Sequence, residues 1–347
     1  MSQNIIEQER IITMINKTNI YEQLTALPYL SAYQQLIQGA IELDVFSNLE
    51  KPVTTKELSE KMNWDEGNTF NLLKGLYSLG YLERKGDTFC NMSETAKYLV
   101  KGKPAYMGSV LAFFCNNQGM SLGNVAQQVK EGPKPQEQTQ QSMDFATYGE
   151  AMRDAQSGIR QYELLEILRS LPEYKNIHKI LDLGCGAGCL GIAVIQDVHK
   201  RTGVLFDRPD MQPLIEETVK LSNMQESISV KSGDFIKDEI GSGYDLILCS
   251  SIMLFAIAGG ADFFAKLRKA LNPGGVVVCL NEGIEADYSE PWDMILGYMV
   301  FNLQGMPMGV IKGQVADAAK DGGFHSVENR SVLLSTGMHD INILRNE

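Results

Sequence analysis

A glycine-rich turn preceded by an acid is the stretch of the sequence best suited to bind a ligand. Residues 179–196 read KILDLGCGAGCLGIAVIQ, an apolar strand that runs into glycines and then into a helix. Read from Gly186, the turn matches the G-x-G-x-x-G pattern of dinucleotide sites, whereas read from Asp182 it is Asp-Leu-Gly-Cys-Gly-Ala-Gly. Glycines let the backbone approach a ligand, and the start of the helix offers free N–H groups. The glycines alone therefore fit either a pyrophosphate or a ligand without phosphate.

Two acids, Asp182 and Asp234, favour the ligand without phosphate, and a third, Asp207, fits either ligand. Asp182 lies at the end of the strand, where its charge would repel a pyrophosphate but suit the ammonium of a methionine moiety. Asp207 ends the pattern GVLFD about 20 residues further on, where a carboxylate accepts hydrogen bonds from ribose hydroxyls. Asp234 follows the next strand in SGDF, so it could accept from an adenine amino group while Phe235 packs on the ring.

The elements that must position these residues alternate between strand and helix patterns from residue 177 onward. This alternation predicts an α/β fold, a parallel sheet with helices on both faces. The last segment, residues 325–345, instead predicts two strands joined by a turn at 335–337, which must be antiparallel. The expected parallel strands are His178–Leu183, Gly203–Phe206, Ser227–Lys231, Asp245–Ser250 and Gly275–Asn281, with helices that include Met211–Ser222 and Ala261–Leu271.

The first hundred residues predict a mainly helical domain with a small hairpin. Apolar spacing indicates helices over 36–45, 54–63 and 67–80, followed by two short strands joined at 85–87, which is a winged-helix pattern. The expected recognition helix carries a single basic residue, Lys74, and the whole chain has a net charge of −12. Because phosphate neutralisation dominates nucleic-acid affinity, we expect no nucleic-acid partner and a dimerisation or lid role instead.

In order and spacing these motifs resemble class I methyltransferases, and the winged-helix start with LFDRPD and SGDF resembles the plant-type small-molecule O-methyltransferase family. The resemblance implies a Rossmann-like seven-stranded sheet with an antiparallel last strand, and S-adenosylmethionine as cofactor. It also implies a winged-helix dimerisation domain at 1–105, a helical connector at 106–170, a methyltransferase domain at 171–347, a homodimer and a small-molecule acceptor. The cofactor residues expected from it are Asp182, Gly184, Gly186, Gly188, Asp207, Arg208, Asp234, Phe235 and Cys249.

The sequence departs from the family where a general base is expected. Many members carry a histidine shortly after the fourth strand, but here that segment is CSSIMLFAIAGG, with Met253 or Leu254 at the position. Glu282, which ends the fifth strand, matches a family position that often carries an acid and is the candidate base. Without a base, a thiol, a thioether or an activated carbon could accept the methyl group. The branch that C-methylates bacteriochlorophyll precursors is similar in lacking the histidine. An oxygen acceptor remains open, and the expected acceptor pocket consists of Met253, Trp292, Tyr298, Met299, Asn302 and Met306.

The remaining composition places limits on partners and location. The six cysteines form no C-x-x-C pair and the four histidines are scattered, so we expect no metal site. No run of about 18 apolar residues and no signal-peptide pattern is present, which predicts no membrane partner and a cytoplasmic location. Two rival hypotheses stay open: a non-catalytic regulator that senses the cofactor, and an NAD-dependent oxidoreductase that rests on residues 186–191 alone.

Overall fold

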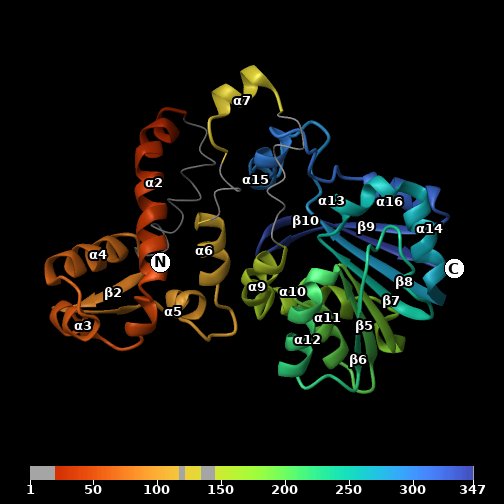
Figure 1. Ribbon diagram of the computed structural model, residues 1–347, viewed down its shortest axis with the longest axis horizontal. Coiled ribbons are helices and arrows are strands. Elements are labelled where there is room, and N and C mark those ends of the chain that lie inside the picture. The colour runs from red at the N-terminus through yellow and green to blue at the C-terminus, as the bar shows by residue number, and fades with distance from the viewer. Residues whose placement is uncertain (1–19, 117–121, 134–144, 347) are drawn as a thin grey trace. The chain divides into compact units, whose positions relative to one another are not determined.

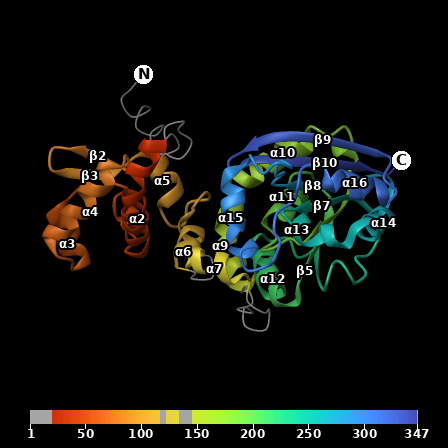
Figure 2. The same cartoon turned by 90° about the horizontal axis from the view of Figure 1, so that it is seen from above.

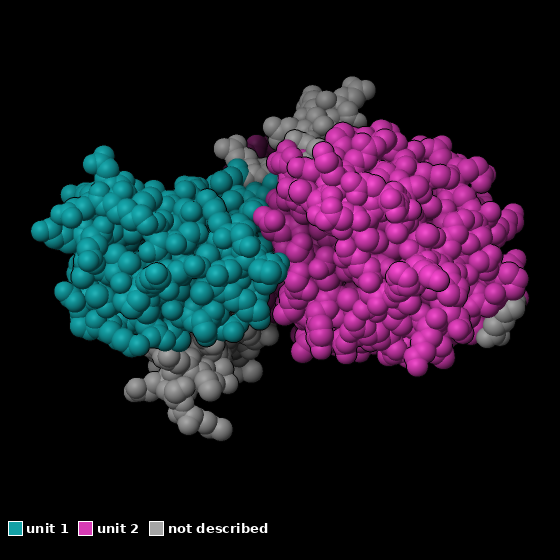
Figure 3. All heavy atoms as spheres, turned by 90° about the horizontal axis from the view of Figure 1, so that it is seen from below, with its two compact units in different colours: residues 1–117 teal, residues 118–347 magenta. Residues whose placement is uncertain are grey.

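The computed structural model describes residues 20–116, 122–133 and 145–346, and the chain separates into two compact units, residues 1–117 and 118–347. Figure 3 colours these units teal and magenta. The polar stretch at 131–141, expected to be a loop, lies outside the described residues from 134 onward. Within the described ranges, no helix is long and apolar enough to cross a lipid bilayer.

The first unit is mainly helical and carries a three-stranded sheet of order β1-β3-β2. The helix at Thr55 starts with a capping box, in which the Thr54 side chain accepts from Glu57 N–H and the Glu57 carboxylate accepts from Thr54 N–H. The helix ends at Asn63, which adopts φ 55°. Its elements are α2 Ile20–Glu42, η1 Phe46–Asn48, β1 Val53–Thr54, α3 Thr55–Met62, α4 Glu66–Ser78, β2 Leu82–Lys85, β3 Thr88–Asn91, α5 Ser93–Leu99 and α6 Gly108–Asn116.

The second unit is built on a seven-stranded sheet of order β6-β5-β4-β7-β8-β10-β9 (Figure 1). The five neighbouring strands β6, β5, β4, β7 and β8 run parallel to one another. Strand β10 pairs antiparallel with both β8 and β9. The α/β class, the parallel strands and the antiparallel end are therefore confirmed. The strands are β4 Lys179–Leu183, β5 Thr202–Asp207, β6 Ile228–Ser232, β7 Tyr244–Ser250, β8 Leu271–Asn281, β9 Ser326–Leu334 and β10 Gly337–Arg345.

Helices cover both faces of this sheet (Figures 1 and 2). Helices α10, α11 and α12 bury apolar residues against one face, and α13, α14 and α16 bury theirs against the other. Alternate strand residues supply the two cores, because successive side chains point to opposite faces. The helical elements are α7 Val125–Glu131, α9 Phe145–Gln156, α10 Ile159–Arg169, η3 Tyr174–Asn176, α11 Cys189–Gln196, η4 Pro209–Met211, α12 Gln212–Leu221, α13 Met253–Ala256, η5 Ile257–Gly259, α14 Gly260–Ala270, α15 Trp292–Asn302 and α16 Gln314–Asp321.

A buried arginine and a charged edge strand are two further features of this unit. Arg201 is 1% exposed, and its guanidinium donates to the carbonyls of Ile177, Val194 and Tyr174 at 3.0, 2.9 and 2.5 Å. At one edge of the sheet, β9 carries Glu328 and Arg330, whose carboxylate and guanidinium pair at 2.6 Å.

Candidate functional site

The glycine-rich turn between β4 and α11 has a backbone shape that favours glycine. Gly184, Gly186 and Gly188 have φ values of 68°, 59° and 82°. A β-carbon on Gly184 would lie 2.4 Å from Ile252 Cγ2, closer than any real contact. Gly184 N–H donates to the carbonyl of Phe206 at 2.8 Å, so the turn is fixed against the end of β5.

Asp207, the last residue of β5, holds this turn in place through hydrogen bonds. Its side chain is buried, and Oδ2 accepts from Gly186 N–H at 2.7 Å while Oδ1 accepts from Arg208 N–H at 2.7 Å. Burial raises the pKa of Asp207, although these two N–H groups favour its charged form. A carboxylate oxygen has more than one acceptor position, so both oxygens remain able to accept a ligand hydroxyl.

Asp182 lies one strand away in β4 and is 2% exposed. Burial raises its pKa to about 7; Gly191 N–H partly offsets this, and the charge of Asp207 adds to it. Among the described residues, Asp182 Oδ2 is buried with no hydrogen-bond partner. A buried acceptor without a donor is rare, so this atom suits a ligand that carries a positively charged donor.

Gln156, at the end of α9, supplies a second buried acceptor near the turn. Its Nε2 and Oε1 lie 3.7 and 3.8 Å from where a β-carbon on Gly186 would stand. Its Oε1 is likewise buried without a hydrogen-bond partner in the described parts of the chain. No sequence pattern pointed to Gln156, because it lies 30 residues before Gly186 and outside any motif.

Asp234 follows β6, beside β5 in the sheet, but its carboxylate turns into its own loop. Oδ1 accepts from Ile236 N–H at 2.9 Å, and Oδ2 pairs with Lys237 Nζ at 3.0 Å. The Lys237 side chain and these backbone donors lower the pKa of Asp234 despite some desolvation. The Phe235 ring packs on Phe263, with ring centres 6.2 Å apart. The structure thus brings Asp182 and Asp207 together at the glycine turn and places Asp234 on the neighbouring loop.

Two other residues expected at the cofactor have different surroundings. Arg208 is exposed and pairs through Nε with Asp210 at 3.1 Å. Cys249 is fully buried in the sheet beside Cys279, and burial raises the pKa of its thiol. The Cys249 thiol is therefore enclosed in the sheet, and a cofactor role for this residue stays a prediction.

Glu282, directly after β8, lies in a polar cluster that the sequence did not reveal. The carboxylate is 7% exposed and forms a hydrogen bond with the side chain of Tyr298 on α15. Burial, followed by the charge of Glu282, raises the pKa of Tyr298. Tyr148 on α9 and Arg160 on α10 also interact electrostatically with Glu282. Burial lowers the pKa of Arg160 and raises that of Tyr148, while Glu282 opposes the shift at Arg160 and adds to that at Tyr148.

The expected acceptor-pocket residues divide into two groups. Trp292, Tyr298, Met299 and Met306 are half-buried on α15 and the loop that follows it. The Tyr298 ring lies against Gly309, where a β-carbon would be 3.4 Å from Cδ2. By contrast, Met253 is wholly buried in the core with α14, and Asn302 is exposed and accepts from Met308 N–H at 2.7 Å. A pocket role for these residues stays a prediction.

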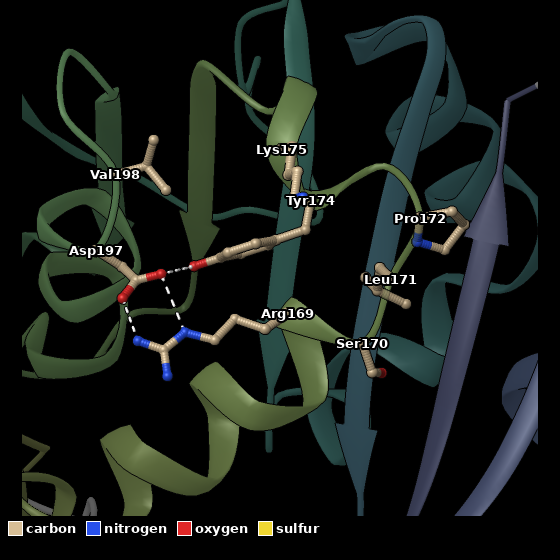
Figure 4. A pocket seen from close by; sticks show the side chains of 8 residues that line it. All are labelled: Arg169, Ser170, Leu171, Pro172, Tyr174, Lys175, Asp197 and Val198. Carbon is tan, nitrogen blue, oxygen red and sulfur yellow. Dashed lines mark hydrogen bonds and ion pairs between the residues drawn. The ribbon is translucent and has the colours of Figure 1, made fainter.

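A separate hollow of about 610 Å³ lies at the other end of the strands, where β4 begins and α11 ends (Figure 4). Figure 4 shows Tyr174 and Arg169 reaching toward the Asp197 carboxylate. Tyr174 donates to Asp197 at 2.6 Å, and Arg169 Nε donates at 3.2 Å. These side chains are satisfied by one another and lie away from the glycine turn. The described residues also contain no group of three or more His, Cys, Asp and Glu side chains able to hold a metal ion.

Comparisons with known proteins agree with this geometry. Residues 132–317 match the family model for an O-methyltransferase domain. The chain is 26% identical over 259 residues to the tetracenomycin polyketide synthesis 8-O-methyl transferase TcmO of Streptomyces glaucescens, covering 72% of this chain and 75% of that protein. It is 22% identical over 265 residues to the N,N-dimethyltransferase OxyT of Streptomyces rimosus, covering 73% and 76%. The structure of human N-acetylserotonin methyltransferase in complex with SAM shares the fold, with a TM-score of 0.77 and 18% identity over 95% of this chain and 98% of that one.

Proposed function

The chain belongs to the O-methyltransferase domain family, and from this premise we propose that it transfers the methyl group of S-adenosylmethionine to a small apolar or aromatic acceptor. It is an enzyme of the S-adenosylmethionine-dependent methyltransferase class, so the premise does not favour a non-catalytic regulator. The observation that carries the proposal is the pair of buried acids, Asp182 and Asp207, at the glycine turn.

The residues at the turn fit this cofactor. An ammonium from its methionine part would give the unpartnered Asp182 Oδ2 the donor that it lacks. Ribose hydroxyls would bind Asp207, which keeps acceptor capacity on both oxygens. The adenine would lie by Asp234 and Phe235. Two carboxylates in one site would repel a pyrophosphate, so the site suits a cofactor that carries no phosphate.

The chain's own contribution to the reaction is alignment and proton transfer. Bound S-adenosylmethionine supplies an electrophilic methyl group on a sulfonium. The protein must hold the acceptor atom in line with it and exclude water. We place the acceptor against the half-buried Trp292, Met299 and Met306, because methionine and aromatic side chains pack well on flat apolar molecules.

Glu282 is the proposed proton acceptor for an oxygen acceptor. Its hydrogen bond to Tyr298 orients the carboxylate, and the half-buried Arg160 guanidinium attracts its charge. The relatives include an O-methyltransferase and an N,N-dimethyltransferase, so experiment must identify the reacting atom.

We also propose that the first unit forms a homodimer of winged-helix domains and that the protein acts in the cytoplasm. Ile20, Leu24 and Leu27 lie on one face of α2 and are 63%, 59% and 56% exposed. Apolar residues at this spacing form a stripe that a second helix can cover. All six cysteines are free thiols, which suits a reducing compartment.

Calorimetry with S-adenosylhomocysteine tests the cofactor assignment without knowledge of the acceptor. We expect the wild-type protein to bind and Asp207→Ala to bind at least about tenfold more weakly, because hydrogen bonds to a charged group are lost. Lack of wild-type binding at millimolar ligand would refute the proposal.

Turnover on a panel of phenols, amines and thiols, read by product mass spectrometry, tests the acceptor. With an oxygen acceptor, Glu282→Gln should slow methylation about 100-fold, since a positioned base is removed. An unchanged rate in that variant would exclude Glu282 as the base.

A further inference from the structure

Lys266 on α14 ties down the loop that follows β6. Its Nζ donates to the backbone carbonyls of Phe235, Ile236 and Asp238 at 2.6, 2.7 and 3.1 Å. A lysine ammonium has three donors, so all of them end on this one loop. The side chain is half-buried, and burial lowers its pKa while the acids of the loop oppose that shift.

The same loop is connected to the strand end that holds Asp207. Gly233 N–H donates to the Asp207 carbonyl at 2.9 Å, and Asp238 Oδ2 accepts from Asp234 N–H at 2.8 Å. These bonds fix the start of the loop, and Lys266 fixes the carbonyls that follow. The directions of the Asp234 carboxylate and the Phe235 ring therefore depend on a residue some 30 positions away in sequence.

We propose that Lys266 is a positioning residue for the adenine end of the cofactor. Its three N–H donors all bind carbonyls of the loop backbone. Lys266 therefore acts through Asp234 and Phe235 and does not itself contact the base. The inference rests on the proposed function, because it takes the adenine to lie at this loop. It goes further in assigning a role to a side chain outside every motif of the sequence.

If Lys266 had only a structural role, it would hold α14 to the loop after β6, and its loss would not change ligand affinity. A positioning role predicts instead that losing the ammonium weakens every ligand with an adenosine part by the same factor. S-adenosylhomocysteine and 5′-methylthioadenosine share the adenosine part, but only the first carries the amino-acid ammonium. Comparison of the two separates effects at the adenine from effects at Asp182.

The experiment measures the dissociation constants of both ligands by calorimetry for the wild type, Lys266→Met and Lys269→Met. Lys269 is an exposed lysine on the same helix and serves as the matched control. We expect Lys266→Met to weaken both ligands equally, by about tenfold, and Lys269→Met to weaken neither. Asp182→Asn should weaken S-adenosylhomocysteine alone.

Each outcome decides between the two claims. Unchanged affinities in Lys266→Met, or a loss confined to S-adenosylhomocysteine, overturn the inference while wild-type binding keeps the proposed function. Failure of the wild type to bind either ligand overturns the proposed function itself. If Lys266→Met does not fold, Lys266→Arg replaces it. A planar guanidinium cannot serve the three carbonyls in the same way, so both affinities should fall by a smaller, equal factor, and unequal or absent losses refute the inference.

Discussion

Three aspartates at neighbouring strand ends differ in their hydrogen-bond and ion-pair partners. Asp207 accepts from a backbone N–H at each oxygen, and Asp234 forms an ion pair with Lys237. Asp182 has a buried oxygen, Oδ2, with no hydrogen-bond partner in the part of the chain that the structure describes. Burial raises the pKa of Asp182 to about 7, so its charge changes near neutral pH. A cationic ligand at this oxygen would therefore change the ionisation of Asp182.

Cofactor binding should therefore depend on pH through Asp182. Its pKa rises from 3.8 to about 7 on folding, so below pH 7 the carboxyl is mostly protonated before the ligand arrives. Binding of an ammonium favours the carboxylate and must then release a proton. We expect affinity for S-adenosylhomocysteine to increase from pH 6 to pH 8. Calorimetry at pH 6 in two buffers of different ionisation enthalpy should detect the released proton.

Asp182→Asn is the control, because the pKa of Asp207 is also raised and could contribute. The variant should bind more weakly at pH 8 and lose most of the proton release at pH 6. Equal proton release in both proteins would assign the effect elsewhere. For folding the sign is opposite: the raised pKa means that this group's contribution to stability decreases as the pH rises from about 4 to 7.

At this scale, the sequence predicted the residues that sit in motifs. A strand-turn-helix pattern fixes where Asp182, Asp207 and the glycines lie, and the structure brings them to one turn, whereas their role in cofactor binding stays a prediction. No sequence pattern pointed to Gln156, Arg160, Tyr148 and Lys266, because each lies on a helix with ordinary spacing. The direction of the Asp234 carboxylate was also beyond prediction, since the turn geometry that captures it forms only in the folded chain.

At the scale of elements, most predicted strands and helices agree with the structure to within one or two residues. The larger differences have local causes. Residues 272–274, between the expected helix Ala261–Leu271 and the expected strand Gly275–Asn281, belong to β8, which begins at Leu271 and pairs with β7 through an irregular register between Tyr244 and Leu246. The segment expected to be a helical connector contains α9 and α10, which are separated at Gly158, whose φ is 70°.

Buried Arg201 should be the element-level determinant of stability in the second unit. It joins η3, α11 and the start of β5 through three carbonyls and lies 4.1 Å from the centre of the Tyr174 ring. Arg201→Met removes all three donors and should lower the free energy of unfolding by about 3 kcal/mol or more. Urea denaturation followed by circular dichroism measures this change.

Arg169→Met is the matched comparison. Its guanidinium is 43% exposed and pairs with Glu166 and Asp197 at the surface. A surface pair contributes about 1 kcal/mol or less, so this variant should differ little from the wild type. Similar losses of unfolding free energy in both variants would show that the burial of Arg201 does not explain its contribution to stability.

At the scale of the whole molecule, the division of the chain into units is visible, whereas the predicted boundaries at 105 and 170 and the homodimer stay predictions. Contacts place α6 with the first unit and α7, α9 and α10 with the second. Tyr148, Gln156 and Arg160 lie in the segment predicted to be a connector, so that segment contributes to the candidate site of the second unit.

Aspartates substituted into the exposed apolar stripe of α2, formed by Ile20, Leu24 and Leu27, test the proposed dimer. Leu24→Asp combined with Leu27→Asp should convert the dimer to a monomer of 38.5 kDa, because carboxylates would be buried in an apolar interface. Val129→Asp on α7 is the control, since Val129 is 69% exposed but lies in the second unit. Light scattering coupled to gel filtration gives both masses, and a monomeric wild type would dismiss the dimer.

The charged edge strand β9 bears on how copies of this protein meet. An exposed edge of a sheet can act as a template to which another molecule adds its own backbone. Glu328 and Arg330 stand on that edge, and Glu328 also pairs with Arg345 of β10 at 2.9 Å. Such ionic side chains resist fibre-like growth, so the molecule can remain dispersed in a crowded cell while its helices stay available for selective association.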